Sequence, residues 1–141
     1  GNPANLFVAG FIGSPAMNFV TVRLSGANGG LWAETDGMKI KVPGPMVARL
    51  GPYAGKEVTF GIPPEDLHIG GDGDDKDLSF PVTVEVDERL GSEILLDVAV
   101  RPATMVASVE PTATAKVHET LRLAVNPARV HFFDNETEAA I

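Results

Sequence analysis

The chain has 141 residues, a formal net charge of −8 at pH 7 and 44% hydrophobic residues. That length fits one domain, or two very small ones that share a sheet, with enough apolar side chains for a core. The acidic balance argues against binding to nucleic acid or to an anionic membrane, so we expect protein partners. Without cysteine, the chain has neither a disulfide framework nor a thiolate nucleophile. No stretch reaches the roughly 20 apolar residues of a membrane-spanning helix, and direct membrane insertion is not expected.

The amino-terminal segment 5–19 is more apolar than a free terminus usually is. We interpret it as the junction to a domain that precedes it, and a short linker helix is predicted within residues 1–17. The apolar face of this helix is expected to be buried against the barrel, against a second copy of the chain or against both. The side chains of that face are spaced at i, i+4: Phe7, Val8, Phe11 and Ile12.

From Asn18 the period of the apolar residues is two, which predicts a strand. Asp36-Gly37 between two short apolar runs is a strong hairpin signal, and 46–50 is expected to form one turn of helix. The 15 Gly and 11 Pro favour short strands joined by tight turns. The predicted fold class is all-β, with about eight or nine strands in small barrels or sandwiches. The other strands are expected at 31–34, 38–42, 56–62, 82–87, 94–100, 121–125 and 130–133.

Two segments interrupt the strand pattern. Pro63 and Pro64 lack the donors that a central strand needs, so 63–68 is predicted to be an edge or a turn. The segment 70–77 is acidic and rich in glycine, and it is predicted to be a flexible loop.

Motifs for catalysis or metal binding do not fit. Between Gly51 and Gly55 stand three residues where a phosphate-binding P-loop has four, and Glu57 replaces its hydroxyl residue. The acidic run 72–77 lacks the ligand order of a calcium loop, and the three histidines lack metal-ligand spacing. The carboxylates within 85–87 alternate with a valine, as solvent-facing strand residues do. We therefore expect no catalytic residue, no cofactor and no metal in this chain.

Four segments together resemble one family. Residues 7–19 read Phe-Val-Ala-Gly-Phe-Ile-Gly-Ser-Pro-Ala-Met-Asn-Phe. They match the junction at which the ATPase domain of MalK/UgpC-type sugar ABC transporter subunits meets its regulatory domain. The segment 60–67 resembles the Gly-Ile-Arg-Pro-Glu box of that family, 90–93 its Leu-Gly-x-Glu turn and 130–134 its terminal His-Leu-Phe-Asp. The chain is therefore similar, over essentially its whole length, to the carboxy-terminal regulatory domain of such subunits.

The resemblance implies two small OB-type, MOP-like (TOBE) barrels. ATP and Mg would bind in the ATPase domain, so this chain would itself be no enzyme and would hold no cofactor. The implied division is 1–17 for the linker helix, 18–70 plus 126–141 for the OB-like barrel, 78–125 for the second β subdomain and 70–77 for the acidic loop.

Contact residues follow from the motif match. The segment near the junction would supply a two-fold contact. Glu65, Glu93 and Phe133 lie in boxes similar to those that the family uses for regulatory-domain contacts and regulator sensing. A plain core role is equally open for the methionine and the aromatic residues. The candidates near the junction are Phe11, Ser14, Pro15, Met17, Asn18 and Phe19.

Two positions depart from the family pattern. Pro63 stands where the box has arginine, which removes a cationic group with five donors. Glu138 stands where a glycine is usual, so the terminal turn is expected to differ or to be loose.

By resemblance, the chain is a regulatory and dimerisation domain in the ATP-binding subunit of a sugar or glycerol-phosphate importer. Its partners would be a second copy, the ATPase domain, the membrane subunits and a regulatory protein, in the cytoplasm at the inner face of the cell membrane. One alternative is a free-standing OB- or MOP-type module for a small oxyanion or an oligonucleotide, although 7 Phe, 1 Tyr and 1 Trp leave few stacking platforms. A hydrolase is a further alternative, which turnover by the purified chain would support.

Overall fold

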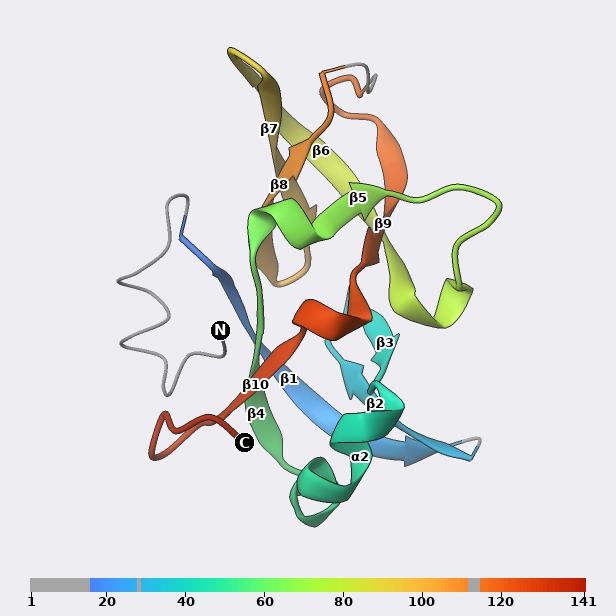
Figure 1. Cartoon of the computed structure of the whole chain (residues 1–141), viewed down its shortest axis with the longest axis vertical. Helices are drawn as coiled ribbons and strands as arrows, with labels where there is room; N and C mark the ends of the chain where they lie inside the picture. Colours follow the sequence, from blue (N-terminus) through green and yellow to red (C-terminus); the bar gives the residue numbers. More distant parts are fainter. Residues whose placement is uncertain (1–15, 28, 112–114) are drawn as a thin grey trace.

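The computed structural model describes residues 16–27, 29–111 and 115–141. Two five-stranded antiparallel sheets make up most of this part of the chain, and they lie at opposite ends of an elongated molecule (Figure 1). The fold is therefore all-β, as the period-two pattern predicts. The predicted amino-terminal helix falls mainly on residues 1–15, outside the described residues. Within the described residues, no helix is long and apolar enough to cross a membrane.

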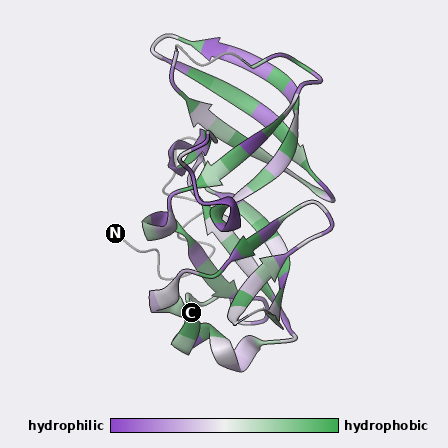
Figure 2. Cartoon of the chain, turned by 90° about the vertical axis from the view of Figure 1, so that its right-hand side faces the viewer, coloured by the Kyte–Doolittle hydropathy of each residue, from purple (hydrophilic) through white to green (hydrophobic). Residues whose placement is uncertain are grey.

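The first sheet contains β1 (Asn18–Ala27), β2 (Gly30–Glu34), β3 (Lys39–Lys41), β4 (Glu57–Ile62) and β10 (His131–Asp134), in the order β10-β4-β1-β2-β3. Val20, Val22 and Leu24 are buried in β1, and the residues between them are exposed. Hydrophobic and hydrophilic residues accordingly alternate along the strands (Figure 2). Asp36-Gly37 connects β2 and β3 into the predicted hairpin. The helix α2 (Gly44–Leu50) and the turn η1 (Gly51–Tyr53) lead to β4.

The second sheet contains β5 (Leu67–Ile69), β6 (Ser79–Leu90), β7 (Glu93–Val100), β8 (Ala103–Val109) and β9 (Thr120–Val125), in the order β5-β9-β6-β7-β8. Its two edge strands, β5 and β8, approach each other, and the short turn η2 (Pro64–Asp66) also contacts β8. The sheet therefore curls toward a barrel, with a seam between β5 and β8. Two further turns, η3 (Lys76–Leu78) and η4 (Pro127–Arg129), precede β6 and β10.

The structure differs from the sequence pattern at two strands. The pattern does not predict β8, because its small residues Ala103, Ala107 and Ser108 weaken the apolar alternation. The predicted division also places 67–70 in the first barrel, whereas β5 pairs with β9 in the second sheet. The physical reason is the proline pair at 63–64, which ends the ladder of β4 and turns the chain through η2 toward the second sheet.

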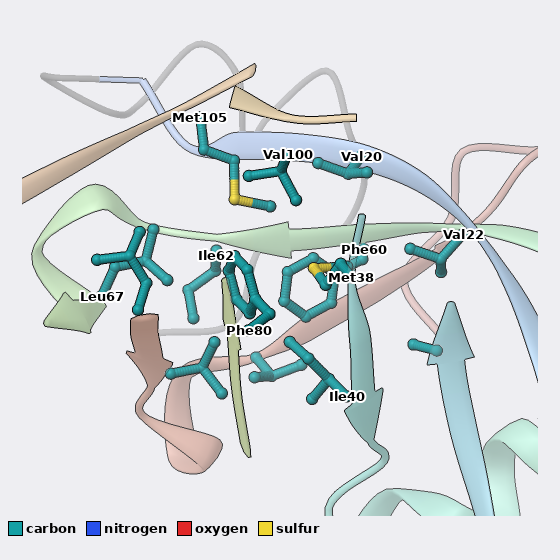
Figure 3. Close-up of a cluster of buried hydrophobic side chains, with 14 of the residues drawn as sticks. Val20, Val22, Met38, Ile40, Phe60, Ile62, Leu67, Phe80, Val100 and Met105 are labelled. Atoms are coloured by element: carbon teal, nitrogen blue, oxygen red, sulfur yellow. The ribbon is translucent and has the colours of Figure 1, made fainter. Parts of the chain in front are cut away.

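The two sheets share one apolar core. Phe60 and Ile62 of β4, Phe80 of β6 and Met105 of β8 belong to a single buried cluster (Figure 3). All four side chains are at most 2% exposed. Separating the sheets would return these side chains to water, which costs roughly 25 cal/mol for each Å² of apolar surface.

Two polar contacts add to the shared core where the sheets meet. The side-chain amide of Asn18, at the start of β1, donates from Nδ2 to the Val106 carbonyl at 2.9 Å, and its Oδ1 accepts from the Val106 N–H at 2.8 Å. Asn18 thus pairs with the edge of β8 as another strand would. In the β2–β3 turn, the Gly37 N–H donates to the Arg101 carbonyl at 3.0 Å. A Cβ atom at Gly37 would lie 2.9 Å from the Arg101 nitrogen, so this approach requires glycine.

We expect Asn18→Ala to lower the free energy of unfolding by about 1–3 kcal/mol, because it leaves two backbone groups of Val106 without partners in a part-buried site. Urea unfolding measures the loss. Asn126→Ala is the matched control, since Asn126 is exposed and its side chain accepts one hydrogen bond, from the exposed Ala128 N–H. Equal stability of the two variants would contradict a role of Asn18 in joining the sheets.

Candidate functional site

Three of the predicted contact residues meet on the outer face of the first sheet. Phe19 lies opposite Gly61 in the β1–β4 pairing, and Gly61 lies opposite His131 in the β4–β10 pairing. The rings of Phe19 and Phe133 are 6.0 Å apart at 77°, an edge-to-face contact, and His131 stacks on Phe133 at 6.4 Å. Together with Met17, these residues form what we call the junction cluster: Met17, Phe19, Gly61, His131 and Phe133.

Gly61 makes room for the junction cluster. A Cβ atom there would lie 3.0 Å from Met17 Sδ, 3.1 Å from Phe133 Cε2 and 3.5 Å from Phe19 Cδ1. Phe133 is fully buried, whereas Met17 and Phe19 are partly exposed. The three predicted contact residues therefore converge on a glycine that their own sequence segments do not contain.

The carboxy-terminal turn follows directly from Phe133. The Asp134 carboxylate accepts hydrogen bonds from the backbone N–H groups of Thr137 at 2.9 Å and Glu136 at 2.8 Å, and these bonds lower the pKa of Asp134. Glu138 adopts a φ of 62°, in the left-handed region that favours glycine. This explains why a glycine is expected at that position. The turn forms nonetheless, with the Glu138 N–H bonded to the Asp134 carbonyl at 2.8 Å.

Asn18 does not belong to the junction cluster. Its side chain faces the second sheet, and both polar atoms of its amide are occupied by Val106. Of the other candidates near the junction, Phe11, Ser14 and Pro15 lie outside the described residues.

Glu65 and Glu93 are both found near Ser108 of β8, Glu65 through a shared pocket at the seam between β5 and β8 and Glu93 through a hydrogen bond. Glu65 in η2 and Ser108 in β8 line a pocket of about 410 Å³ there, together with His68 of β5. The Ser108 hydroxyl donates to Glu93 Oε2 at 2.6 Å. Pro63, in place of the box arginine, opens η2 with a φ of −64°. Within the described residues, neither glutamate forms a salt bridge, so this seam carries negative charge.

The loop 70–77 closes on β5. Asp74 accepts from the Gly71 N–H at 2.8 Å and lies 2.9 Å from His68 Nε2. Both contacts lower the pKa of Asp74, and the hydrogen bond from the Gly71 backbone has the larger effect. In the part of the chain that the structure describes, no three His, Cys, Asp or Glu residues are placed to hold a metal ion.

Two family models match the chain. The MalK OB fold domain matches residues 13–67, and the TOBE domain matches residues 60–133, which is more than half of the chain. The chain belongs to the TOBE domain family.

Relatives of this TOBE chain are named as ATP-binding proteins of transporters. It is 37% identical to the sulfoquinovosyl glycerol transport ATP-binding protein SmoE of Agrobacterium fabrum, over 99% of this chain and 37% of SmoE. It is 37% identical to the oligosaccharides import ATP-binding protein MsmX of Bacillus subtilis, over 99% of this chain and 38% of MsmX. The chain thus spans less than two fifths of the length of these relatives.

A solved structure shares the fold. The TOBE chain superposes on the cytoplasmic molybdate-binding protein ModG with a TM-score of 0.59, covering 82% of this chain and 94% of ModG. The sequences are only 15% identical, so this likeness shows the fold alone.

We expect Gly61→Ala to destabilise the TOBE chain by about 1–3 kcal/mol, because the added methyl group overpacks Met17 Sδ and the buried Phe133 ring. Thermal or urea unfolding measures this. Gly26→Ala is the matched control in β1, since no atom lies within 4 Å of a Cβ at that position. If both variants unfold at the same urea concentration, the close packing at Gly61 makes no contribution to the free energy of unfolding.

We expect the free energy of unfolding to depend on pH near neutrality because of His131. Burial lowers its pKa below 6.5, and nearby Asp66 opposes the shift. As the pH falls below 6.5, His131 binds a proton in the unfolded chain before it does so in the folded chain. The free energy of unfolding is therefore highest above pH 6.5. It decreases as the pH falls from 6.5 to the lower pKa of His131 in the folded state. The pKa values of the Asp74 and Asp134 carboxyl groups are also lowered, but they change the free energy of unfolding only below about pH 3.8.

Urea unfolding between pH 7 and pH 5 is expected to show this loss of stability, and His131→Gln is expected to flatten it. An NMR titration of the His131 ring reads the same pKa directly. A ring that titrates above pH 6.5 would contradict the effect of burial.

Proposed function

We propose that this TOBE chain is the carboxy-terminal regulatory and dimerisation domain of the ATP-binding subunit of a carbohydrate ABC importer. The observation that carries the proposal is the match of 99% of the chain to ATP-binding proteins named for the transport of sulfoquinovosyl glycerol or oligosaccharides. In the whole protein, ATP and Mg would bind in the ATPase domain, and the present chain would supply no catalytic residue. Its place would be the cytoplasmic face of the membrane, attached to the membrane subunits.

The start of β1 suits a domain that responds to an attached ATPase. Three successive side chains are held there on two opposite sides: Met17 and Phe19 lie over Gly61 on the outer face, and Asn18 between them binds the edge of β8. A displacement of the preceding chain would therefore act on both sheets at once. Because the two sheets share one core, the domain would move as a unit. Contacts whose free energy differs by a few kcal/mol between two states of the subunit would be enough to shift the populations of those states.

The junction cluster is the proposed contact with a second copy. Met17 and Phe19 leave part of their apolar surface exposed beside the fully buried Phe133. A two-fold axis through this face would bury the same side chains from both copies.

The acidic seam is the proposed contact for a regulatory protein. The Glu65 carboxylate lines the pocket between β5 and β8, and the Glu93 carboxylate accepts a hydrogen bond from Ser108, which lines the same pocket. Complementary basic groups on a regulator would speed association and set its orientation.

Sedimentation equilibrium over a range of concentrations tests the proposed dimer. We expect a reversible monomer–dimer equilibrium, and we expect Met17→Glu to shift it to monomer, because the charge would have to be desolvated at the contact. Val117→Glu is the matched control, since Val117 is 46% exposed in the loop that precedes β9 of the second sheet. Circular dichroism checks that both variants fold. A wild-type chain that stays monomeric at high concentration would contradict this role.

A further inference from the structure

A second pocket, unrelated to the junction cluster or the seam, lies between the two sheets. Its volume is about 480 Å³, and it is bordered by the β2–β3 hairpin on one side and by η3, β6 and β9 on the other. Pockets for small molecules have about this size and often lie where two structural units meet. We call it the basic pocket, after its main residues: Trp32, Lys39, Lys41, Lys76, Ser79 and Arg122.

The charge of the basic pocket is opposite to that of the chain. The chain has 11 Lys and Arg residues against 19 Asp and Glu residues, yet four cations and a single carboxylate, that of Asp77, line this pocket. Lys39 is paired with Glu34 at 3.8 Å. Among the described residues, Lys41, Lys76 and Arg122 form no salt bridge. Three positive charges without a salt-bridge partner therefore face a common space that holds one carboxylate, that of Asp77.

Hydrogen bonds within the protein hold the Arg122 side chain in place. The Arg122 guanidinium donates from Nε to Ser79 Oγ at 3.1 Å and from Nη2 to the Ser79 carbonyl at 2.9 Å. The stem of Lys41 crosses Gly30 so closely that a Cβ atom there would lie 2.9 Å from Lys41 Cε. Because the Arg122 guanidinium is fixed by hydrogen bonds within the protein, less conformational entropy is lost from this side chain when a ligand binds.

Trp32 forms one wall of the basic pocket. Its indole N–H donates to the Ala27 carbonyl at 3.0 Å, and the ammonium group of Lys39 lies 4.9 Å from the ring centroid. Trp32 is only 8% exposed, so most of its ring is packed within the protein and a small part borders the pocket. It is also the only tryptophan of the chain.

An adjoining pocket gives room for the uncharged part of a ligand. It has a volume of about 510 Å³ and shares Lys41 and Asp77 with the basic pocket. Its other walls are mainly apolar and include Leu31, Val42 and Leu78, with Asp75 as a second carboxylate besides Asp77. A molecule with an anionic group at one end and an organic body at the other could therefore occupy both.

We propose that the basic pocket binds the phosphate group of a small molecule, such as a phosphorylated sugar. Guanidinium and ammonium groups are the side chains that recognise phosphate, the first through paired N–H donors and the second as a point charge. Asp77 and the nearby Glu34 restrict the positive field to a small region, which disfavours a long polyanion. This site is independent of the proposed dimer contact, because no residue is common to both.

Bound phosphate would link the two sheets. Lys39 and Lys41 come from the first sheet, whereas Arg122 comes from β9 of the second. A ligand that bridges these side chains binds only the folded chain and not the unfolded chain. It therefore raises the melting temperature of the chain as the ligand concentration rises above Kd.

Fluorescence of Trp32 in the full chain tests the proposal. The probes are a hexose monophosphate, inorganic phosphate and the unphosphorylated hexose, each at constant ionic strength. We expect a saturable change with the hexose monophosphate, accompanied by a higher melting temperature, and no change with the hexose. Tighter binding of the monophosphate than of inorganic phosphate would assign the adjoining pocket to the organic body, and equal binding would assign the basic pocket to free phosphate.

Matched variants locate the site. Lys41→Gln and Arg122→Gln are expected to raise Kd at least about tenfold, which corresponds to about 1.4 kcal/mol. Arg23→Gln removes the same charge from an exposed position that pairs with Glu57 outside the pocket, and it should leave Kd unchanged. Because Lys41→Gln breaks no hydrogen bond found among the described residues, it separates binding from folding.

The proposal is overturned if neither phosphate probe gives a saturable signal, or if sodium chloride at equal ionic strength reproduces the signal. It is also overturned if all three variants bind alike. Binding of polyglutamate without binding of either phosphate probe would instead show a surface for acidic proteins. None of these results bears on the dimer, which sedimentation tests separately.

Discussion

The burial of Phe60, Ile62, Phe80 and Met105 in one cluster is the constraint on which the other features depend (Figure 3). These side chains come from both sheets, so neither sheet has a complete core of its own. The Asn18–Val106 pair and the Gly37–Arg101 contact then fix the relative placement of the sheets with directional hydrogen bonds. The apolar cluster supplies the stabilising free energy, and the polar contacts supply the register.

Each surface of interest lies where this arrangement brings distant segments together. The junction cluster combines the start of β1 with β4 and β10, and the acidic seam combines η2 and β5 with β8. The basic pocket combines the β2–β3 hairpin with η3 and β9. A protein of net charge −8 thus carries a negative seam and a separate positive pocket. Charges of opposite sign at separate places allow two kinds of partner to be recognised independently.

Much of the fold could be predicted from local pattern. The alternation in β1 and the Asp36-Gly37 turn predict strands and a hairpin because side-chain period and turn conformation are local properties. The alternation fails for β8, whose small residues carry little apolar contrast. It also cannot assign β5 to a sheet, because strand pairing depends on where the prolines at 63–64 direct the chain. Motif resemblance named Met17, Phe19 and Phe133, but it gave no reason for their meeting at Gly61.

By itself, the sequence determined the fold class and the family, and it proposed the segments that carry contact residues, because these depend on periodicity and on motifs within short stretches. Only the tertiary structure decided that Asn18 joins the two sheets and that Glu65 and Glu93 lie beside the same serine. It also decided that the cations of the basic pocket meet around Trp32. Lys41 and Arg122 are far apart along the chain, and only the shared core brings the strands that carry them to one pocket.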